Sequence, residues 1–247
     1  QTADAGLCSA VVTYTAPTAT DNVAIASFSG DAASGDTFPV GTTTVTYTAI
    51  DDAGNTTTSD FTVTITDDED PAIADTPSNI TQTADAGECS AVINYTAPTA
   101  SDNCSITSFS GDAATGDAFP VGTTTVTYTA VDPAGNTTTS SFTVTITDDE
   151  DPAIAGTPAN ITQTADAGIC GAVISWDDLT ASDNCAVASL SGTHDSGDTF
   201  PVGATSVIFT ATDVNGNSTT STFTVTVTDD EDPSISGAPG DITQTAD

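Results

Sequence analysis

Three acidic runs are the first feature of this sequence that could do chemistry. Each run reads D-D-E-D and is followed by proline, and the runs begin 81 residues apart, at Asp67, Asp148 and Asp229. Neighbouring carboxylates repel by about 1 kcal/mol per pair even in water, and the chain contains no Lys or Arg. Solvent, arginines of a partner, or a hard cation must therefore accommodate the charge.

Two further oxygen-rich motifs recur with the same period and favour the cation. One is S-D-N (T-D-N in its first occurrence) and the other is D-x-x-G-N. With the acidic runs they offer the six to eight oxygen ligands that Ca²⁺ takes, whereas Mg²⁺ keeps more of its water. The predicted calcium ligands are Asp67, Asp68, Glu69, Asp70, Asp102, Asn103, Asp132, Asn136, Asp148, Asp149, Glu150, Asp151, Asp183, Asn184, Asp213 and Asn217. The alternative is a solvated linker that holds no ion.

The composition predicts an all-β protein. The net charge of −35 comes from 35 acidic residues, nearly all of them Asp, which suits turns and tight oxygen coordination. β-branched residues dominate over helix formers, and regular apolar alternation argues against disorder. A surface without cations cannot neutralise phosphates, so nucleic acid and anionic membranes are excluded as partners. No apolar run has transmembrane length, so we expect no membrane insertion in this segment.

A strict internal repeat divides the chain. The string Q-T-A-D-A-G begins at Gln1, Gln82 and Gln163, and Q-T-A-D returns at Gln244. This period is too long for a solenoid turn and suits one small β-sandwich per repeat. Proline after each acidic run stops a strand and so marks a boundary. The predicted domains are 1–69, which lacks its first strand, 70–150, 151–231, and 232–247 as the opening strand of a further repeat.

The second repeat shows the expected strands most clearly. Residues 125–131 and 141–147 alternate between apolar side chains and Thr or Ser, and a glycine-containing loop, 132–136, joins them as a hairpin. Further strands are expected over 79–84, 89–95 and 105–110, with a corner at 119–122. The side chains predicted to face the core are Val126, Tyr128, Ala130, Phe142, Val144 and Ile146. The pattern predicts tandem immunoglobulin-like sandwiches arranged end to end.

The sandwich topology is what would position the acidic motifs. The S-D-N loop and the last hairpin loop both lie at the end where the first strand begins, and there they meet the preceding acidic run. We therefore expect the calcium ligands to gather at junctions between domains.

Several longer strings carry a family resemblance. They are D-x-E-x-P followed by P-x-N-I-T, then C-S-A-V, A-P-T-A-S-D-N-C, F-P-V-G-T-T-T-V-T-Y-T-A-x-D-x-A-G-N and F-T-V-T-I-T-D. Over nearly the whole period, three times, the sequence resembles the HYR (hyalin repeat) domain. The resemblance implies an immunoglobulin-like fold and an extracellular adhesive or structural role, as in the tandem arrays of large bacterial cell-surface adhesins. Many members carry a cysteine before the last strand, but Thr139, Ser140 and Ser141 stand there, so that disulfide cannot form.

Equal spacing pairs Cys89 with Cys104 and Cys170 with Cys185. Each disulfide would close a loop of about 15 residues, worth roughly 3 kcal/mol, and would imply an oxidising location, secreted or at the cell surface. Zinc is the alternative, but it needs four ligands and the chain has one His. Cys8 is left single, as a buried thiol or an interchain bridge.

The predicted pairing leaves one question open. A bond between Cys89 and Cys104 requires the segment between them to double back, which would carry Asp102 to the opposite end of the sandwich, beside Asp85. Nine extended residues reach about 30 Å, so both arrangements are feasible. Either arrangement places the acids at a junction, but not at the same one.

The leading functional hypothesis is a structural stalk or fibre segment of an extracellular adhesin, stiffened by calcium at its junctions. The expected partners are neighbouring repeats, identical chains in a fibre, and an unidentified surface or glycan ligand. The alternative is a receptor- or glycan-binding module, with its recognition surface where the repeats differ. Those positions are Trp176, Asp177, Asp178, Thr193, His194 and Asp195.

Other function classes have less support. An enzyme is not expected, because a single His cannot supply a nucleophile–His–acid set in each repeat and a linker offers no pocket. Rows of outward threonines would suit ice or mineral binding, and a salt-loving source would explain the acidity without calcium.

Overall fold

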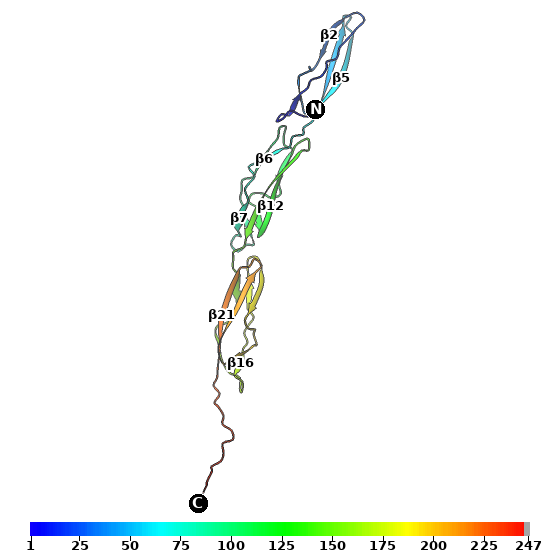
Figure 1. Cartoon of the computed structure of the whole chain (residues 1–247). Coiled ribbons are helices and arrows are strands. Elements are labelled where there is room, and N and C mark those ends of the chain that lie inside the picture. Colours follow the sequence, from blue (N-terminus) through cyan, green and yellow to red (C-terminus); the bar gives the residue numbers. More distant parts are fainter. Residues whose placement is uncertain (245–247) are drawn as a thin grey trace. The chain divides into compact units, whose positions relative to one another are not determined.

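The structure is a computed structural model that describes residues 1–244, and within that range it contains β-strands and turns but no helix (Figure 1). The all-β prediction is confirmed, and the architecture is that of tandem β-sandwiches. None of the described residues forms a helix long and apolar enough to cross a membrane.

The first repeat contains five strands, and the second and third contain eight each. The first has β1 (Ser9–Val11), β2 (Ile25–Gly30), β3 (Thr37–Pro39), β4 (Gly41–Asp51) and β5 (Thr56–Ile65). The second has β6 (Ala72–Ala74), β7 (Ile80–Thr83), β8 (Ser90–Val92), β9 (Thr99–Ser101), β10 (Ser108–Gly111), β11 (Ala118–Pro120), β12 (Gly122–Val131) and β13 (Thr137–Thr147). The third has β14 (Ala153–Ala155), β15 (Ile161–Thr164), β16 (Gly171–Val173), β17 (Thr180–Ser182), β18 (Val187–Gly192), β19 (Thr199–Pro201), β20 (Gly203–Asp213) and β21 (Ser218–Thr228).

The compact units do not coincide with the repeats. One unit consists of Gln1–Gln82 and Val92–Ile146, and the other of Thr83–Ala91 and Thr147–Asp247. The short stretch 83–91 of the second repeat therefore packs with the third repeat. That stretch contains Cys89.

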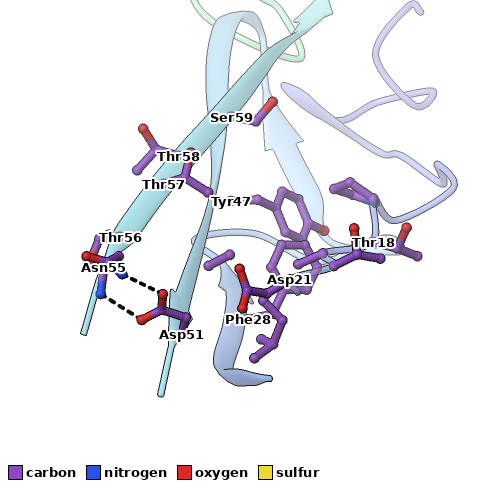
Figure 2. Close-up of a pocket in the computed structure, with 15 residues that line it drawn as sticks. Thr18, Asp21, Phe28, Tyr47, Asp51, Asn55, Thr56, Thr57, Thr58 and Ser59 are labelled. Atoms are coloured by element: carbon purple, nitrogen blue, oxygen red, sulfur yellow. Dashed lines mark hydrogen bonds between the residues drawn. The ribbon is translucent and has the colours of Figure 1, made fainter. Parts of the chain in front are cut away.

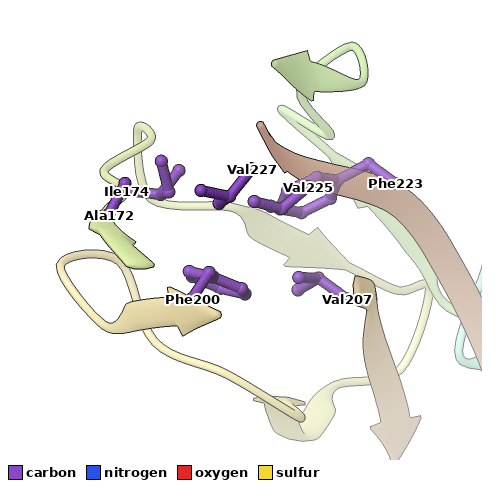
Figure 3. Close-up of a cluster of buried hydrophobic side chains, with 7 residues drawn as sticks. All are labelled: Ala172, Ile174, Phe200, Val207, Phe223, Val225 and Val227. Atoms are coloured by element: carbon purple, nitrogen blue, oxygen red, sulfur yellow. The ribbon is translucent and has the colours of Figure 1, made fainter. Parts of the chain in front are cut away.

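The third repeat shows the sandwich in full. Its larger sheet has the order β15-β21-β20-β18, with β15 parallel to β21 and the other pairs antiparallel. Two short antiparallel pairs, β14–β17 and β16–β19, complete it. The core lies between the long hairpin and the short strands (Figure 3). It consists of Ala172, Ile174, Phe200, Val207, Phe223, Val225 and Val227.

The predicted hairpin of the second repeat is confirmed. β12 and β13 pair antiparallel with Val126 opposite Phe142, and all six side chains predicted to face the core are buried. Alternation works here because long paired strands keep a strict period of two. The shorter strands were located less well, since only 90–92 of the expected 89–95 is strand, and the pair β6–β9 was not predicted.

The segment expected to open a further repeat forms no strand over residues 232–244, and residues 245–247 lie outside the described part of the chain. Its counterparts β6 and β14 pair with β9 and β17, which come later in the same repeats.

Candidate metal centres at the repeat junctions

Each acidic run folds back on the repeat that precedes it. The Gly6 amide donates to Glu69 Oε2 at 2.8 Å, and the Gly87 amide donates to Glu150 Oε2 at 2.9 Å. Both glycines have positive φ, 71° and 77°, which places the turn in a region that other residues rarely adopt. The glutamate side chain of each run therefore holds the run against the turn by a hydrogen bond.

The same fold-back positions the first aspartate of each run. The Glu69 amide donates to Asp67 Oδ1 at 3.2 Å, and the Glu150 amide donates to Asp148 Oδ1 at 3.2 Å. This short-range bond within an acidic run is the kind that Asp makes in turns. It leaves the second carboxylate oxygen of Asp67 and of Asp148 available.

The S-D-N loop lies against this aspartate. Within the loop, the Cys104 amide donates to Asp102 Oδ2 at 2.9 Å. Asn103 Nδ2 donates both to the Leu7 carbonyl and to Asp67 Oδ1, each at 3.1 Å. Asn184 Nδ2 makes the same two bonds, to the Glu88 carbonyl at 3.1 Å and to Asp148 Oδ1 at 3.2 Å. One asparagine thus ties the turn, the acidic run and the following repeat together.

The last hairpin loop supplies a second, more deeply buried carboxylate. Asp132 is only 2% exposed and accepts from the Asn136 amide at 2.8 Å and from Asn136 Nδ2 at 2.7 Å. Burial raises the pKa of Asp132, but the hydrogen bonds from Asn136 and the loop amides outweigh it, so the pKa lies below its ordinary value. Asp213, equally buried, is held by Asn217 with the same result for its pKa. Both carboxylates are therefore charged at neutral pH.

The asparagines of this loop also reach the acidic run. Asn136 Nδ2 donates to the carbonyls of Asp67 at 3.3 Å and of Glu69 at 3.2 Å. Asn217 Nδ2 donates to the Asp148 carbonyl at 3.3 Å. We name the two assemblies the first junction and the second junction. The first consists of Leu7, Cys8, Asp67, Asp102, Asn103, Cys104, Asp132 and Asn136, and the second of Glu88, Cys89, Asp148, Asp183, Asn184, Cys185, Asp213 and Asn217.

Each junction contains three buried side-chain oxygens that have no hydrogen-bond partner. At the first they are Asp67 Oδ2, Asp102 Oδ1 and Asn103 Oδ1, and at the second Asp148 Oδ2, Asp183 Oδ1 and Asn184 Oδ1. Asp67 itself is only 8% exposed. An unpaired buried carboxylate is costly, and buried polar groups in native proteins are normally satisfied.

Carboxylates of each junction converge closely enough to share one ion. Carboxylate oxygens of Asp67 and Asp102 lie within 4.8 Å of each other, and so do those of Asp148, Asp183 and Asp213. All the available donors are oxygens, because the Cys104 sulfur is in a disulfide. Carboxylate and amide oxygens fit a hard divalent cation.

Some of the predicted ligands do not reach these clusters. Asp68, Asp70, Asp149 and Asp151 are exposed, so nothing beyond the sequence pattern supports a ligand role for them. Glu69 and Glu150 bind backbone amides, and the Asn136 and Asn217 amides act as donors. The sequence-based prediction did not include the turn residues, such as Leu7 and Glu88. The repeated string T-A-D-A-G-x-C before a strand could have indicated this turn.

The predicted disulfide pairing is wrong. The structure joins Cys8 to Cys104 and Cys89 to Cys185, each across 96 residues, and leaves Cys170 free and exposed. The S-D-N-C loop lies at the end of its repeat that meets the preceding turn, so its cysteine finds the cysteine of that turn without doubling back. For the same reason Cys8 is not single, and Asp102 lies with Asp67.

The equivalent loops of the first repeat have the same local shape. Asn55 bonds Asp51 through its amide at 2.8 Å and Nδ2 at 2.7 Å, at the rim of an open groove of about 450 Å³ that Asp21 also lines (Figure 2). The Val23 amide donates to Asp21 Oδ2 at 2.9 Å, as the Cys104 amide does to Asp102. The loops therefore take their shape from their own residues.

The positions at which the repeats differ lie partly in the third repeat's core. Trp176 packs edge-on against Phe223 and Phe200, with ring centroids 5.1 and 6.0 Å apart. His194 lies 5.0 Å from Phe200 between centroids. Trp176 is therefore only partly buried, packed against the core, and it also lines an open hollow.

Comparison with known proteins gives a consistent family. The HYR domain matches residues 1–65, 66–146 and 147–227. "Hyalin" from Lytechinus variegatus is 40% identical over 257 residues, covering 99% of this chain and 48% of that protein. "Hyalin" from Strongylocentrotus purpuratus is 41% identical over 224 residues, covering 88% and 19%. The chain thus spans half or less of these relatives, and both are animal proteins, so the expected kinship with bacterial adhesins is not supported.

Solved structures resemble the chain only distantly. Cadherin domains 1–3 of Drosophila N-cadherin are 14% identical with a TM-score of 0.33, covering 87% of this chain and 92% of that one. Mouse PcdhgC3 EC1-3 is 14% identical with a TM-score of 0.31, covering 77% of each chain. Scores this low carry no inference about ligands or assembly.

Proposed function

Because the chain belongs to the HYR domain family, we propose that it is a stalk or fibre segment of an extracellular adhesin, stiffened by calcium where successive repeats meet. The family supports an adhesion-related module, and the two disulfides fit an oxidising, extracellular location. Both considerations favour a structural protein over an enzyme.

The three orphaned oxygens at each junction carry this proposal. They come from the acidic run and from the S-D-N loop, so an ion that satisfies them binds two segments far apart in sequence at once. At the first junction Asp67, Asp102 and Asn103 would hold the ion, with Asp132 contributing charge nearby. At the second, Asp148, Asp183, Asn184 and Asp213 would do so. Calcium would supply the positive charge that a chain without Lys or Arg lacks.

The stiffening follows from electrostatics. Without an ion, two or three carboxylates within a few ångströms repel one another and favour separation of the acidic run from the loop. With the ion, separating them would cost the binding free energy. We expect a weak affinity, with a Kd of about 10⁻⁴–10⁻³ M, as in other extracellular calcium modules.

The remaining partners belong to the same proposal. Neighbouring repeats are the partners that the junctions join, while identical chains in a fibre and a surface or glycan ligand would contact the loops. Solvation alone and arginines of a partner are the rival explanations of the acidic runs. The clustering of buried carboxylates within the chain itself favours an ion over both rivals.

Calcium titration at high sodium concentration tests the proposal directly. Isothermal titration calorimetry should find two ions per chain, one at each cluster, and sodium in excess should not abolish binding, because the site selects for divalent charge. A salt-adapted acidic surface would instead give no saturable calcium binding under these conditions.

Small-angle scattering tests the mechanical part. We expect the chain to become more flexible when calcium is chelated, and the Asp67→Asn/Asp148→Asn double variant to be flexible with calcium present. An Asp68→Asn/Asp149→Asn double variant is the matched control, because it removes the same charge from exposed positions of the same runs. Scattering that does not change with chelation would remove stiffening from the proposal while leaving the calcium sites intact.

A further inference from the structure

The third repeat ends in one half of a junction. Cys170 occupies the place that Cys8 and Cys89 occupy in the earlier repeats, but it is free and exposed. We propose that Cys170 and the acidic run at 229–232 form a docking half-site, which binds the D-N-C loop of a further HYR repeat and forms a disulfide with its cysteine. This inference rests on the tandem arrangement in the proposed function and does not require calcium.

The half-site already has the conformation of the two complete junctions. The Gly168 amide donates to Glu231 Oε2 at 3.0 Å, as Gly6 and Gly87 do to their glutamates. The Glu231 amide donates to Asp229 Oδ1 at 3.1 Å, which fixes the first aspartate of the run as before. The turn closes through the Ile169 amide and the Asp166 carbonyl at 2.9 Å.

The two complete junctions show what this half-site recognises. At each, one asparagine amide donates to a turn carbonyl and to the first aspartate of the run, and the next residue is the bonded cysteine. The corresponding acceptors in the third repeat are the Ile169 carbonyl and Asp229 Oδ1. Cys170, Ile169, Asp229 and Glu231 line a hollow of about 410 Å³. A loop reading D-N-C fits all of these features together.

No free loop within residues 1–247 can be the partner. Cys104 and Cys185 are already bonded, and the equivalent loop of the first repeat has Val23 in place of cysteine. The segment 232–247 repeats the opening sequence of the earlier repeats. We therefore assign the partner as the repeat that this segment opens, with its cysteine 96 residues after Cys170, as in both existing disulfides.

The bond forms by thiol–disulfide exchange with a small-molecule disulfide such as oxidised glutathione as the oxidant. The Cys170 thiolate attacks one sulfur of the oxidant and releases one reduced thiol. The partner's thiolate then attacks the mixed disulfide at the Cys170 sulfur and releases the second. Two protein thiols lose two protons and two electrons, and one oxidant molecule becomes two thiols.

An extended chain tests the pairing. Appending a second copy of residues 167–247 after Asp247 continues the period, because Asp247 and Asp166 are equivalent. After refolding in a glutathione redox buffer, alkylation and peptide mapping should show Cys170 bonded to the appended copy of Cys185. The free thiol should move to the appended copy of Cys170. Replacing the appended copy of Cys185 with valine, as at Val23, should leave Cys170 alkylated.

The two existing disulfides serve as the folding control. If Cys8–Cys104 and Cys89–Cys185 form in the extended chain while Cys170 stays free, or pairs with the other appended cysteine, the proposal is overturned. Calcium is varied independently by adding a chelator. Pairing of Cys170 with the expected cysteine in both conditions supports this inference even where the calcium proposal fails. Two bound ions together with a free Cys170 would support the calcium proposal and contradict the disulfide.

A second variant keeps the proposal testable if the extended chain does not fold. Val23→Cys gives the first repeat a D-N-C loop, so Cys170 of one copy should bond the introduced cysteine of the next. A ladder of disulfide-linked oligomers should appear, and it should vanish in Val23→Cys/Cys170→Ser. Thr44→Cys, an exposed position on β4, is the matched control for chance oxidation. Equal cross-linking of Cys170 to both introduced cysteines would overturn recognition of the loop.

Discussion

Two copies of the same pair of loops lie in different surroundings in this molecule. In the first repeat, Asp21, Asp51 and Asn55 border an open groove, and Val23 is 79% exposed. In the second repeat, the equivalent loops meet an acidic run and a turn, and Asp132 is only 2% exposed. The hydrogen bonds inside the loops hardly differ, with the asparagine amide 2.8 Å from the aspartate in both.

The comparison separates what a repeat does alone from what a junction adds. The shape of the loops is local, because short Asx-type bonds hold it in both repeats. Burial of the carboxylate, the orphaned oxygens and the disulfide come only with the neighbouring segment. The proposed metal centre would therefore be a property of two adjoining repeats, and changes at the second repeat's loops should have effects that the same changes in the first repeat lack.

Removing the disulfide should give the largest difference. In the chain-entropy estimate, a bond that closes about 100 residues stabilises the folded state by about 4.7 kcal/mol. We expect Cys8→Ala/Cys104→Ala to lower the free energy of unfolding by up to that amount, measured by guanidinium denaturation without calcium. The matched change in the first repeat, Val23→Ala, removes an exposed side chain and should stay within about 0.5 kcal/mol. If the double variant unfolds at the same guanidinium concentration as the parent chain, the disulfide contributes nothing to holding the first junction.

Removing one carboxylate should give the next largest difference. With Asp67→Asn, calorimetry should find one calcium per chain instead of two. At a calcium concentration about 100-fold above Kd, that site's stabilisation of about 2.7 kcal/mol should disappear from thermal unfolding.

The control for that change is Asp21→Asn, which removes the same charge from the equivalent loop of the first repeat, at the open groove. It should leave two bound ions and an unchanged response to calcium. Loss of an ion from Asp21→Asn would mean that the first repeat's loops bind calcium by themselves, and the junction would no longer define the site.

The sequence predicted the local features well. The hairpin β12–β13 follows directly from strict alternation. Sandwich topology also predicted Asp102 and Asp132 beside Asp67, although the predicted cysteine pairing left open the end at which Asp102 lies. Alternation and loop position need only one repeat to specify them. The hairpin and the positions of the loops could therefore be predicted without knowing how the repeats contact each other.

The features that the sequence did not reveal all depend on the neighbour. Pairing Cys89 with Cys104 used the shortest spacing, whereas the actual partner of each cysteine is 96 residues away, in the adjoining repeat. The role of Leu7 is likewise hidden, because a backbone carbonyl carries no side-chain signal. The exposure of Asp68 and Asp70 could not be inferred either, since four adjacent acids look equivalent until one of them is fixed by a turn.

A change of pKa should give the smallest difference, and its size distinguishes the two loops. Hydrogen bonds from Asn55 lower the pKa of Asp51, while at Asp132 burial opposes the bonds from Asn136 without overcoming them. With calcium chelated, both carboxylates should titrate below the ordinary value in NMR. Asn55→Ala and Asn136→Ala should each raise the pKa of the partner aspartate towards the ordinary value, and the rise should be larger for Asp132, because burial opposes the remaining loop amides there. In the parent chain, the stabilisation from each lowered pKa is present at pH values above the ordinary pKa of Asp, and it is lost as the pH falls through the folded-state pKa. In Asn136→Ala this stabilisation should be smaller, so stability should depend less on pH in that range. Equal pKa changes in the two variants would show that the junction does not bury Asp132 in solution.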